Sequence, residues 1–166
     1  AAGHLAKELA VPVHVHVAED LADVEDAQKR GHAGPLERLM TLGALPTGSV
    51  LAHGVHLGEA QVAICETAGF WLVQNPRSNA GNRVGFARHL SKSQRLALGT
   101  DGWVADMRAE RLALGAEATN AGSPLDEGAV AVRMKGGFAL LSERFGLPFS
   151  AALAAGNAAD VVVWRS

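Results

Sequence analysis

The chain has 166 residues, of which 48% are hydrophobic and 19% are charged, and its formal net charge is -2. This composition suits one domain with a hydrophobic core and excludes a disordered or fibrous protein. A near-neutral charge without a basic run gives no electrostatic basis for binding nucleic acid or an anionic membrane.

Strands and helices are predicted to alternate along the chain. In order, the patterns predict a strand at 12–17, helices at 19–30 and 35–42, a strand at 49–53, a helix at 59–68, strands at 70–73 and 95–99, helices at 106–118 and 126–145, and a last strand at 160–164. The 19–30 helix illustrates the evidence, because Glu19 and Asp20 lie in its first turn, Lys29 and Arg30 in its last, and Gly31 follows it.

This alternation predicts an α/β fold in which parallel strands are joined by right-handed crossovers. Four such units amount to half of an eight-stranded barrel, which typically needs about 250 residues. The glycine-rich segment 80–85 follows a strand but does not open a clear helix, and it lacks both the dinucleotide fingerprint and the P-loop Lys-Ser/Thr. The sequence therefore gives no support for nucleotide binding at a glycine-rich loop.

Ionisable residues stand where several predicted strands end. His14 and His16 share one face of the first strand, Glu19 follows it, His53 ends the second, and Asp101 follows the fourth. Each has a structural explanation: the histidines as hydrogen-bonded core residues, Glu19 as a helix first-turn acid, and Asp101 as part of an Asp-Gly turn. Together they would converge on one pocket, and these residue types suit a Zn²⁺-activated water.

At this point the chain resembles a known family. The segments that carry the resemblance are VHVAE at 15–19, LAHGVHL at 51–57, NPRSN at 75–79 and LGTDG at 98–102. They are similar to the fifth to eighth strand motifs of the amidohydrolase superfamily, in its cytosine deaminase, chlorohydrolase and adenosylhomocysteine deaminase branch. QNPRSN at 74–79 with NRVG at 82–85 is most like the aminohydrolases that have been linked to selenium metabolism.

The resemblance implies a role for four residues. His16 would be the fifth-strand metal ligand, and Asp101 would be the eighth-strand ligand that also accepts a proton from the attacking water. Glu19 would carry a proton to the leaving group, and His53 would hydrogen-bond the water and stabilise the developing oxyanion. The resemblance also implies, less directly, that Asn79 shapes the loop after the seventh strand.

The same resemblance implies that the chain is the C-terminal half of such an enzyme. We expect residues 1–155 to form a partial (β/α)8 TIM-type barrel, strands 5–8 with outer helices. GNAADVVV within 156–166 is similar to the segment that begins the return to a small β-domain. The family's first-strand His-x-His pair, which supplies two metal ligands, has no counterpart before residue 13. Gln74 and Asn75 also stand where many members carry a His.

These features predict a metal-dependent hydrolase that deaminates or dechlorinates a small heterocyclic substrate. Zn²⁺ or Fe²⁺ is expected in the intact enzyme, whereas we expect the chain alone to bind metal weakly or not at all and to be inactive. Its open sheet edges predict association, as a homo-oligomer or with another chain. The alternative from a different class is a catalytically silent half-barrel that acts only as an assembly module.

A second enzyme hypothesis is a metal-free hydrolase with Ser78 as nucleophile and His53 as base. No Gly-x-Ser-x-Gly motif surrounds Ser78, which argues against this hypothesis.

The single cysteine, Cys65, lies in an apolar helical stretch and is expected to be a buried, inert thiol. Because no signal-peptide pattern or long apolar stretch is seen, we expect a cytoplasmic location and no membrane partner.

Overall fold

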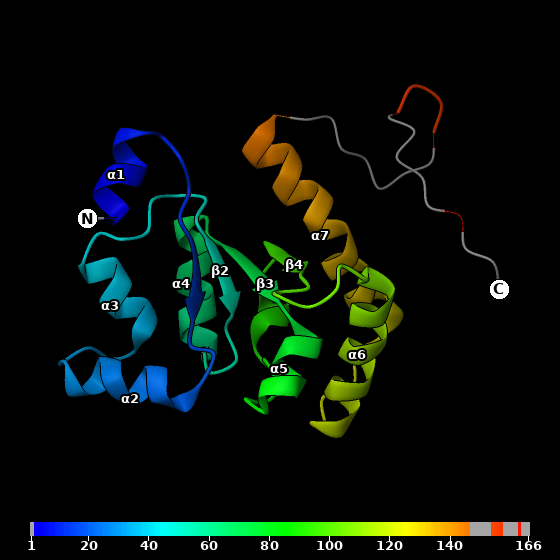
Figure 1. Cartoon of the computed structure of the whole chain (residues 1–166), viewed down its shortest axis with the longest axis horizontal. Helices are drawn as coiled ribbons and strands as arrows, with labels where there is room; N and C mark the ends of the chain where they lie inside the picture. Colours follow the sequence, from blue (N-terminus) through cyan, green and yellow to red (C-terminus); the bar gives the residue numbers. More distant parts are fainter. Residues whose placement is uncertain (1, 147–153, 158–162, 164–166) are drawn as a thin grey trace.

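The computed structural model describes residues 2–146, 154–157 and 163. Its strands form one parallel sheet in the order β1-β2-β3-β4, with helices following the strands (Figure 1). The strands are β1 (His14–Val17), β2 (Val50–His53), β3 (Trp71–Gln74) and β4 (Leu96–Leu98). The helices are α1 (Ala2–Glu8), α2 (Leu21–Lys29), α3 (Pro35–Thr41), α4 (Glu59–Ala68), α5 (Pro76–Asn82), α6 (Met107–Asn120) and α7 (Glu127–Phe145), with a 3-10 helix η1 (Leu90–Lys92). The predicted parallel α/β arrangement is confirmed.

The main core lies between the sheet and the helices that follow β1 and β2. Leu51 and Leu72 project from neighbouring strands into one cluster with Val62 and Cys65 of α4 and Leu36 of α3. The expected burial of Cys65 is confirmed, and burial raises the pKa of its thiol to about 12, which disfavours the reactive thiolate. On β1, where Val15 and Val17 join this cluster, the alternate residues His14 and His16 face the other way and are exposed.

The helix predicted from residue 19 begins later, at Leu21. Asp20 caps it, because the Asp20 carboxylate accepts a hydrogen bond from Ala22 N at 2.8 Å. Asp23 accepts from the backbone N–H groups of Glu19 and Asp20, which completes the cap. Glu19 therefore lies before the helix, in the turn after β1, and its side chain is free to face the strand ends.

Among the described residues, two α-helices were not predicted, and neither was the 3-10 helix η1. The first is α1, and the second is α5, which occupies the start of the glycine-rich segment that was predicted not to form a helix. Pro76 sits in the first turn of α5, where a missing N–H costs nothing. Gly81 disfavours an isolated helix, but a Cβ there would lie 2.8 Å from Cζ2 of Trp103, so the packed indole explains why this glycine is tolerated.

The predicted strand at 160–164 lies almost wholly outside the described residues. So does most of the segment 156–166 that was expected to lead into a β-domain. Within 154–157 the chain makes a turn, in which Asn157 N donates to Ala154 O at 3.2 Å. In the part of the chain that the structure describes, no helix has the length and apolarity needed to cross a membrane.

A pair of adjacent glycines tests the packing of α7 on β4. A Cβ on Gly136 would lie 1.9 Å from the carbonyl oxygen of Leu96, whereas one on Gly137 meets nothing within 4 Å. We expect Gly136→Ala to lower the free energy of unfolding by about 1–3 kcal/mol through overpacking. Gly137→Ala should raise it by up to about 1 kcal/mol, since alanine favours the helix. Urea unfolding of both variants measures the difference, and equal midpoints would contradict this packing.

Candidate active site

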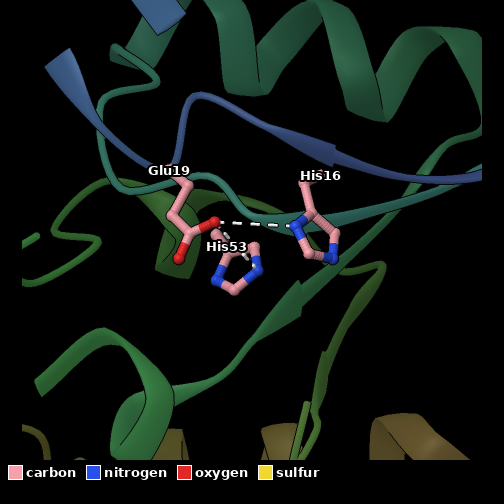
Figure 2. Close-up of side chains that lie close together, drawn as sticks. All are labelled: His16, Glu19 and His53. Carbon is pink, nitrogen blue, oxygen red and sulfur yellow. Dashed lines mark ion pairs between the residues drawn. The ribbon is translucent and has the colours of Figure 1, made fainter. Parts of the chain in front are cut away.

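Three of the predicted site residues meet at the carboxyl ends of β1 and β2. Glu19 Oε2 lies 3.5 Å from His16 Nδ1 and 3.5 Å from His53 Nε2, and Figure 2 shows the three side chains pointing toward one another. The His16 and His53 rings pack edge to face, with centroids 4.6 Å apart. The sequence placed these residues at consecutive strand ends, and the structure brings them into contact.

Asp101 reaches the same place from the other side of His53. His53 Nε2, at the end of β2, lies 3.5 Å from Glu19, which follows β1, and 3.8 Å from Asp101 Oδ2, which follows β4. Side chains from the ends of three parallel strands therefore converge on one point.

His53 is fixed at the end of β2 and is completely buried. Its backbone has φ +72° and Gly54 follows with φ +58°, so the strand stops and turns at this residue. Its Nδ1 lies 2.9 Å from Asn79 Oδ1, an atom that only accepts hydrogen bonds, so the ring donates from Nδ1. Nε2 is then directed at the two carboxylates, and it has no hydrogen-bond partner among the described residues.

Asp101 occupies a turn with φ +53° just before Gly102, so it is the turn residue that the Asp-Gly pattern indicated. Its side chain also belongs to the site. Ser78 Oγ donates to Asp101 Oδ2 at 2.6 Å, and this hydrogen bond is the main cause that holds the pKa of the Asp101 carboxyl below its usual value. His53 and His16 contribute smaller effects in the same direction.

Glu19 is held from the side opposite the histidines. Asn82 Nδ2, at the end of α5, donates to Glu19 Oε1 at 3.0 Å, while Oε2 faces His16 and His53. The Glu19 side chain is only 19% exposed. One oxygen is therefore fixed by an amide, and the other is directed into the site.

These residues fit a divalent cation. One ligand atom each from His16, Glu19 and His53 lies within 4.8 Å of the other two, and these nitrogen and carboxylate donors are types that zinc takes. The buried Nε2 of His53 is without a partner among the described residues, and a polar atom in that position calls for a cation, a water or a substrate atom. Asp101 is outside this compact trio but within 3.8 Å of His53.

A cleft of about 550 Å³ adjoins the site on the side of β4. It is lined by Ser78, Asn82, Asp101, Gly102, Trp103 and Val104. The Trp103 indole is 51% exposed, and the Arg77 guanidinium lies 6.0 Å from the centre of its ring. A cleft of this size accommodates a small ligand, and the indole offers it an aromatic wall.

The other sequence candidates lie apart from this group. His14 is exposed on β1, and His56 lines a different cleft with Arg88 and His89, so neither joins the group around His53. Ser78 Oγ donates to Asp101, and within residues 2–146 no hydrogen bond joins it to His53, which argues against Ser78 as a nucleophile. Sequence reasoning missed Asn82, although its segment had been noted; its contact with Glu19 spans 63 positions.

Comparison with known proteins identifies a matching family and several similar proteins. The model described as the amidohydrolase family matches residues 1–165. A 5-methylthioadenosine/S-adenosylhomocysteine deaminase of Thermoanaerobacter pseudethanolicus is 37% identical over 101 residues, which cover 59% of this chain and 23% of the relative. The deaminase of the same name from Desulforudis audaxviator is 31% identical over 173 residues, covering 96% of this chain and 39% of the relative.

Solved structures agree with this match. An adenosine deaminase from Xanthomonas campestris with bound zinc is 31% identical with a TM-score of 0.68, and the match covers 84% of this chain and 34% of the other. A guanine deaminase from C. acetobutylicum has a TM-score of 0.69 at 18% identity, over 81% of this chain and 36% of the other, and is evidence for the fold alone. The chain thus spans well under half the length of these relatives.

Proposed function

Because the chain belongs to the amidohydrolase family, we propose that it supplies the proton-transfer residues and part of the metal site of an enzyme that hydrolytically deaminates a small heterocycle. The observation that carries the proposal is the meeting of His16, Glu19, His53 and Asp101 around one buried nitrogen, His53 Nε2, which has no hydrogen-bond partner in the part of the chain that the structure describes. Four ionisable groups from three strand ends within this space support a catalytic role over a purely stabilising one.

Each residue has a chemical role in this proposal. His16 and Asp101 hold a divalent cation, with further ligands from outside the chain, since a catalytic zinc normally takes three protein ligands. The chemistry supplied by a bound cation is the activation of water as a nucleophile. Glu19 uses Oε2 to take a proton and to deliver it to the leaving amine, while Oε1 stays bonded to Asn82.

His53 stabilises charge on the substrate. Because Nδ1 donates to Asn79, the ring can donate to a developing oxyanion from Nε2 only when both ring nitrogens carry protons. The Glu19 and Asp101 carboxylates, 3.5 and 3.8 Å from Nε2, are the groups that compensate this positive charge. The ring is completely buried, so a hydrogen bond from it would act with little competition from water.

The proposed metal is zinc and the proposed substrate an adenine nucleoside. Zinc is supported by the nitrogen and oxygen donors and by the related adenosine deaminase that holds it. The substrate class is supported by the names of the relatives and by the half-exposed Trp103 indole in the cleft beside Asp101, a surface on which a flat heterocycle can stack. Deamination is favoured over dechlorination, because the relatives are named as deaminases.

The test is ammonia release from adenosine by a zinc-loaded protein that contains this chain together with the remaining strands found in its relatives. We expect turnover in the parent protein, and Asp101→Asn should lower it by roughly 10²–10⁴-fold while also reducing bound zinc, because this residue both holds the cation and accepts a proton. Asp126→Asn serves as the control, since Asp126 caps α7 and is not among the residues that line the cleft. Absence of ammonia from adenosine and from methylthioadenosine would contradict the proposal.

The geometry of the same residues argues against the alternative of a catalytically silent assembly module. A silent module has no need to keep a buried imidazole nitrogen that faces two carboxylates without a hydrogen bond to any described residue, an arrangement that costs free energy. The relatives named as deaminases also do not favour it. Association through the sheet edges remains compatible with either function, and sedimentation of the chain measures it.

A further inference from the structure

We propose that α5 is a positioning helix, in which Ser78, Asn79 and Asn82 each fix a different one of the site's reactive side chains. Ser78 Oγ donates to Asp101 at 2.6 Å, Asn79 Oδ1 accepts from His53 at 2.9 Å, and Asn82 Nδ2 donates to Glu19 at 3.0 Å. The three reactive residues follow or end three different strands, β4, β2 and β1. One helix turn therefore links strand ends that are far apart in the sequence.

The helix needs outside support to hold this position. At seven residues α5 is shorter than the roughly 12 at which isolated helices become even marginally stable. Arg77 supplies the support, because its backbone N–H and its Nε both donate to the buried carboxylate of Glu110 on α6, at 3.1 and 2.6 Å. The Arg77 guanidinium also donates to the carbonyl of Val104, so that α5, α6 and the loop after β4 are joined.

The bond from Asn79 selects one tautomer of His53. Asn79 is 3% exposed and His53 is completely buried, so water does not compete for this hydrogen bond. An acceptor at Nδ1 places the ring proton there in the neutral imidazole and leaves the Nε2 lone pair directed into the site. Without that acceptor the proton could occupy either nitrogen.

The hydrogen bond from Asn82 gives the two oxygens of Glu19 different roles. Because Oε1 is engaged by the amide, the carboxylate cannot rotate freely, and Oε2 stays 3.5 Å from both histidines. An amide is a neutral donor, so it orients the carboxylate without the strong stabilisation of the anion that a lysine or arginine would give. Asn82 is itself exposed, and its replacement should not disturb the core.

The first test uses the metal-free 166-residue chain, so its outcome does not depend on the proposed function. With ¹⁵N-labelled histidine, we expect the neutral His53 ring to carry its proton on Nδ1 in the parent and in Asn79→Asp, which keeps an acceptor. In Asn79→Leu the ring should lose this preference. A parent ring protonated on Nε2, or an unchanged tautomer in a folded Asn79→Leu variant, would overturn the proposal.

The second test covers the case in which the buried Asn79→Leu change prevents folding. In the same chain, Glu19→Gln should shift the side-chain amide resonances of Asn82, whereas Glu25→Gln on the exposed face of α2 should not. In the zinc-loaded enzyme, Asn82→Ala should lower kcat by roughly 10- to 100-fold with KM little changed, as for other residues that orient metal-site groups. Asn120→Ala at the exposed end of α6 is the matched control.

These readouts separate the two proposals. If the resonances and the tautomer behave as expected but adenosine is not deaminated, then α5 positions the site residues for a different reaction. If adenosine is deaminated and Asn82→Ala leaves kcat unchanged, then the helix does not act as a positioning element, and the proposed function stands without it.

Discussion

Replacing Glu19 by Gln should lower the kcat of a zinc-loaded protein that contains this chain by roughly 10²–10⁴-fold and leave its zinc content nearly unchanged. Glutamine keeps the size of the side chain, and its amide oxygen can still accept the hydrogen bond that Glu19 Oε1 accepts from Asn82. It cannot take up and release a proton at the position of Oε2, which faces both histidines at 3.5 Å. The lower kcat should therefore reflect slower proton transfer in the chemical step.

Measurement of zinc content beside kcat distinguishes two assignments of Glu19. The family resemblance makes His16 and Asp101 the ligands, whereas the compact trio of donor atoms is formed by His16, Glu19 and His53. If Glu19→Gln loses both zinc and turnover, then Glu19 is a ligand and the assignment as proton shuttle is wrong. Glu25→Gln is the control, since Glu25 is 64% exposed and pairs with Lys29 on α2, so its replacement should change neither quantity.

Replacing Glu110 by Ala should destabilise the chain by about 3–5 kcal/mol, against a total stability of about 5–15 kcal/mol for a domain. Glu110 is fully buried and receives two hydrogen bonds from Arg77, whose side chain is only 19% exposed. Removal of the carboxylate leaves a largely buried guanidinium and one backbone N–H without their acceptor. Urea unfolding followed by circular dichroism measures the loss as a lower midpoint.

Two further variants show whether the effect comes from the buried charge. Glu127→Ala removes an acid that is 85% exposed and pairs with Arg111 at 2.7 Å, and it should cost under about 1 kcal/mol. The double change Arg77→Met with Glu110→Leu should be less destabilising than Glu110→Ala alone, because it leaves no unpaired buried charge. A midpoint for Glu110→Ala equal to that for Glu127→Ala would mean that Arg77 finds another partner.

The sequence by itself determined the order of the strands and the helices after them. Apolar runs of four to six residues predict buried strands, and the amphipathic stretches between them, with acids first and bases last, predict helices. Both patterns are local, so they can be recognised without knowledge of the tertiary structure. Helix α4 was predicted with its observed bounds, and β1, β2, β3 and β4 were each predicted to within two residues. The same prediction of strand ends places four ionisable residues there: His16, Glu19, His53 and Asp101.

Only the tertiary structure decided how those residues are held. A segment of seven residues with Gly81 within it does not predict a helix, and α5 forms because Glu110 and Trp103 pack against it from elsewhere in the chain. The Asn82–Glu19 and Asn79–His53 bonds span 63 and 26 positions. Contacts at such separations depend on the parallel pairing that places the ends of β1, β2 and β3 side by side, and no local pattern specifies which strands pair.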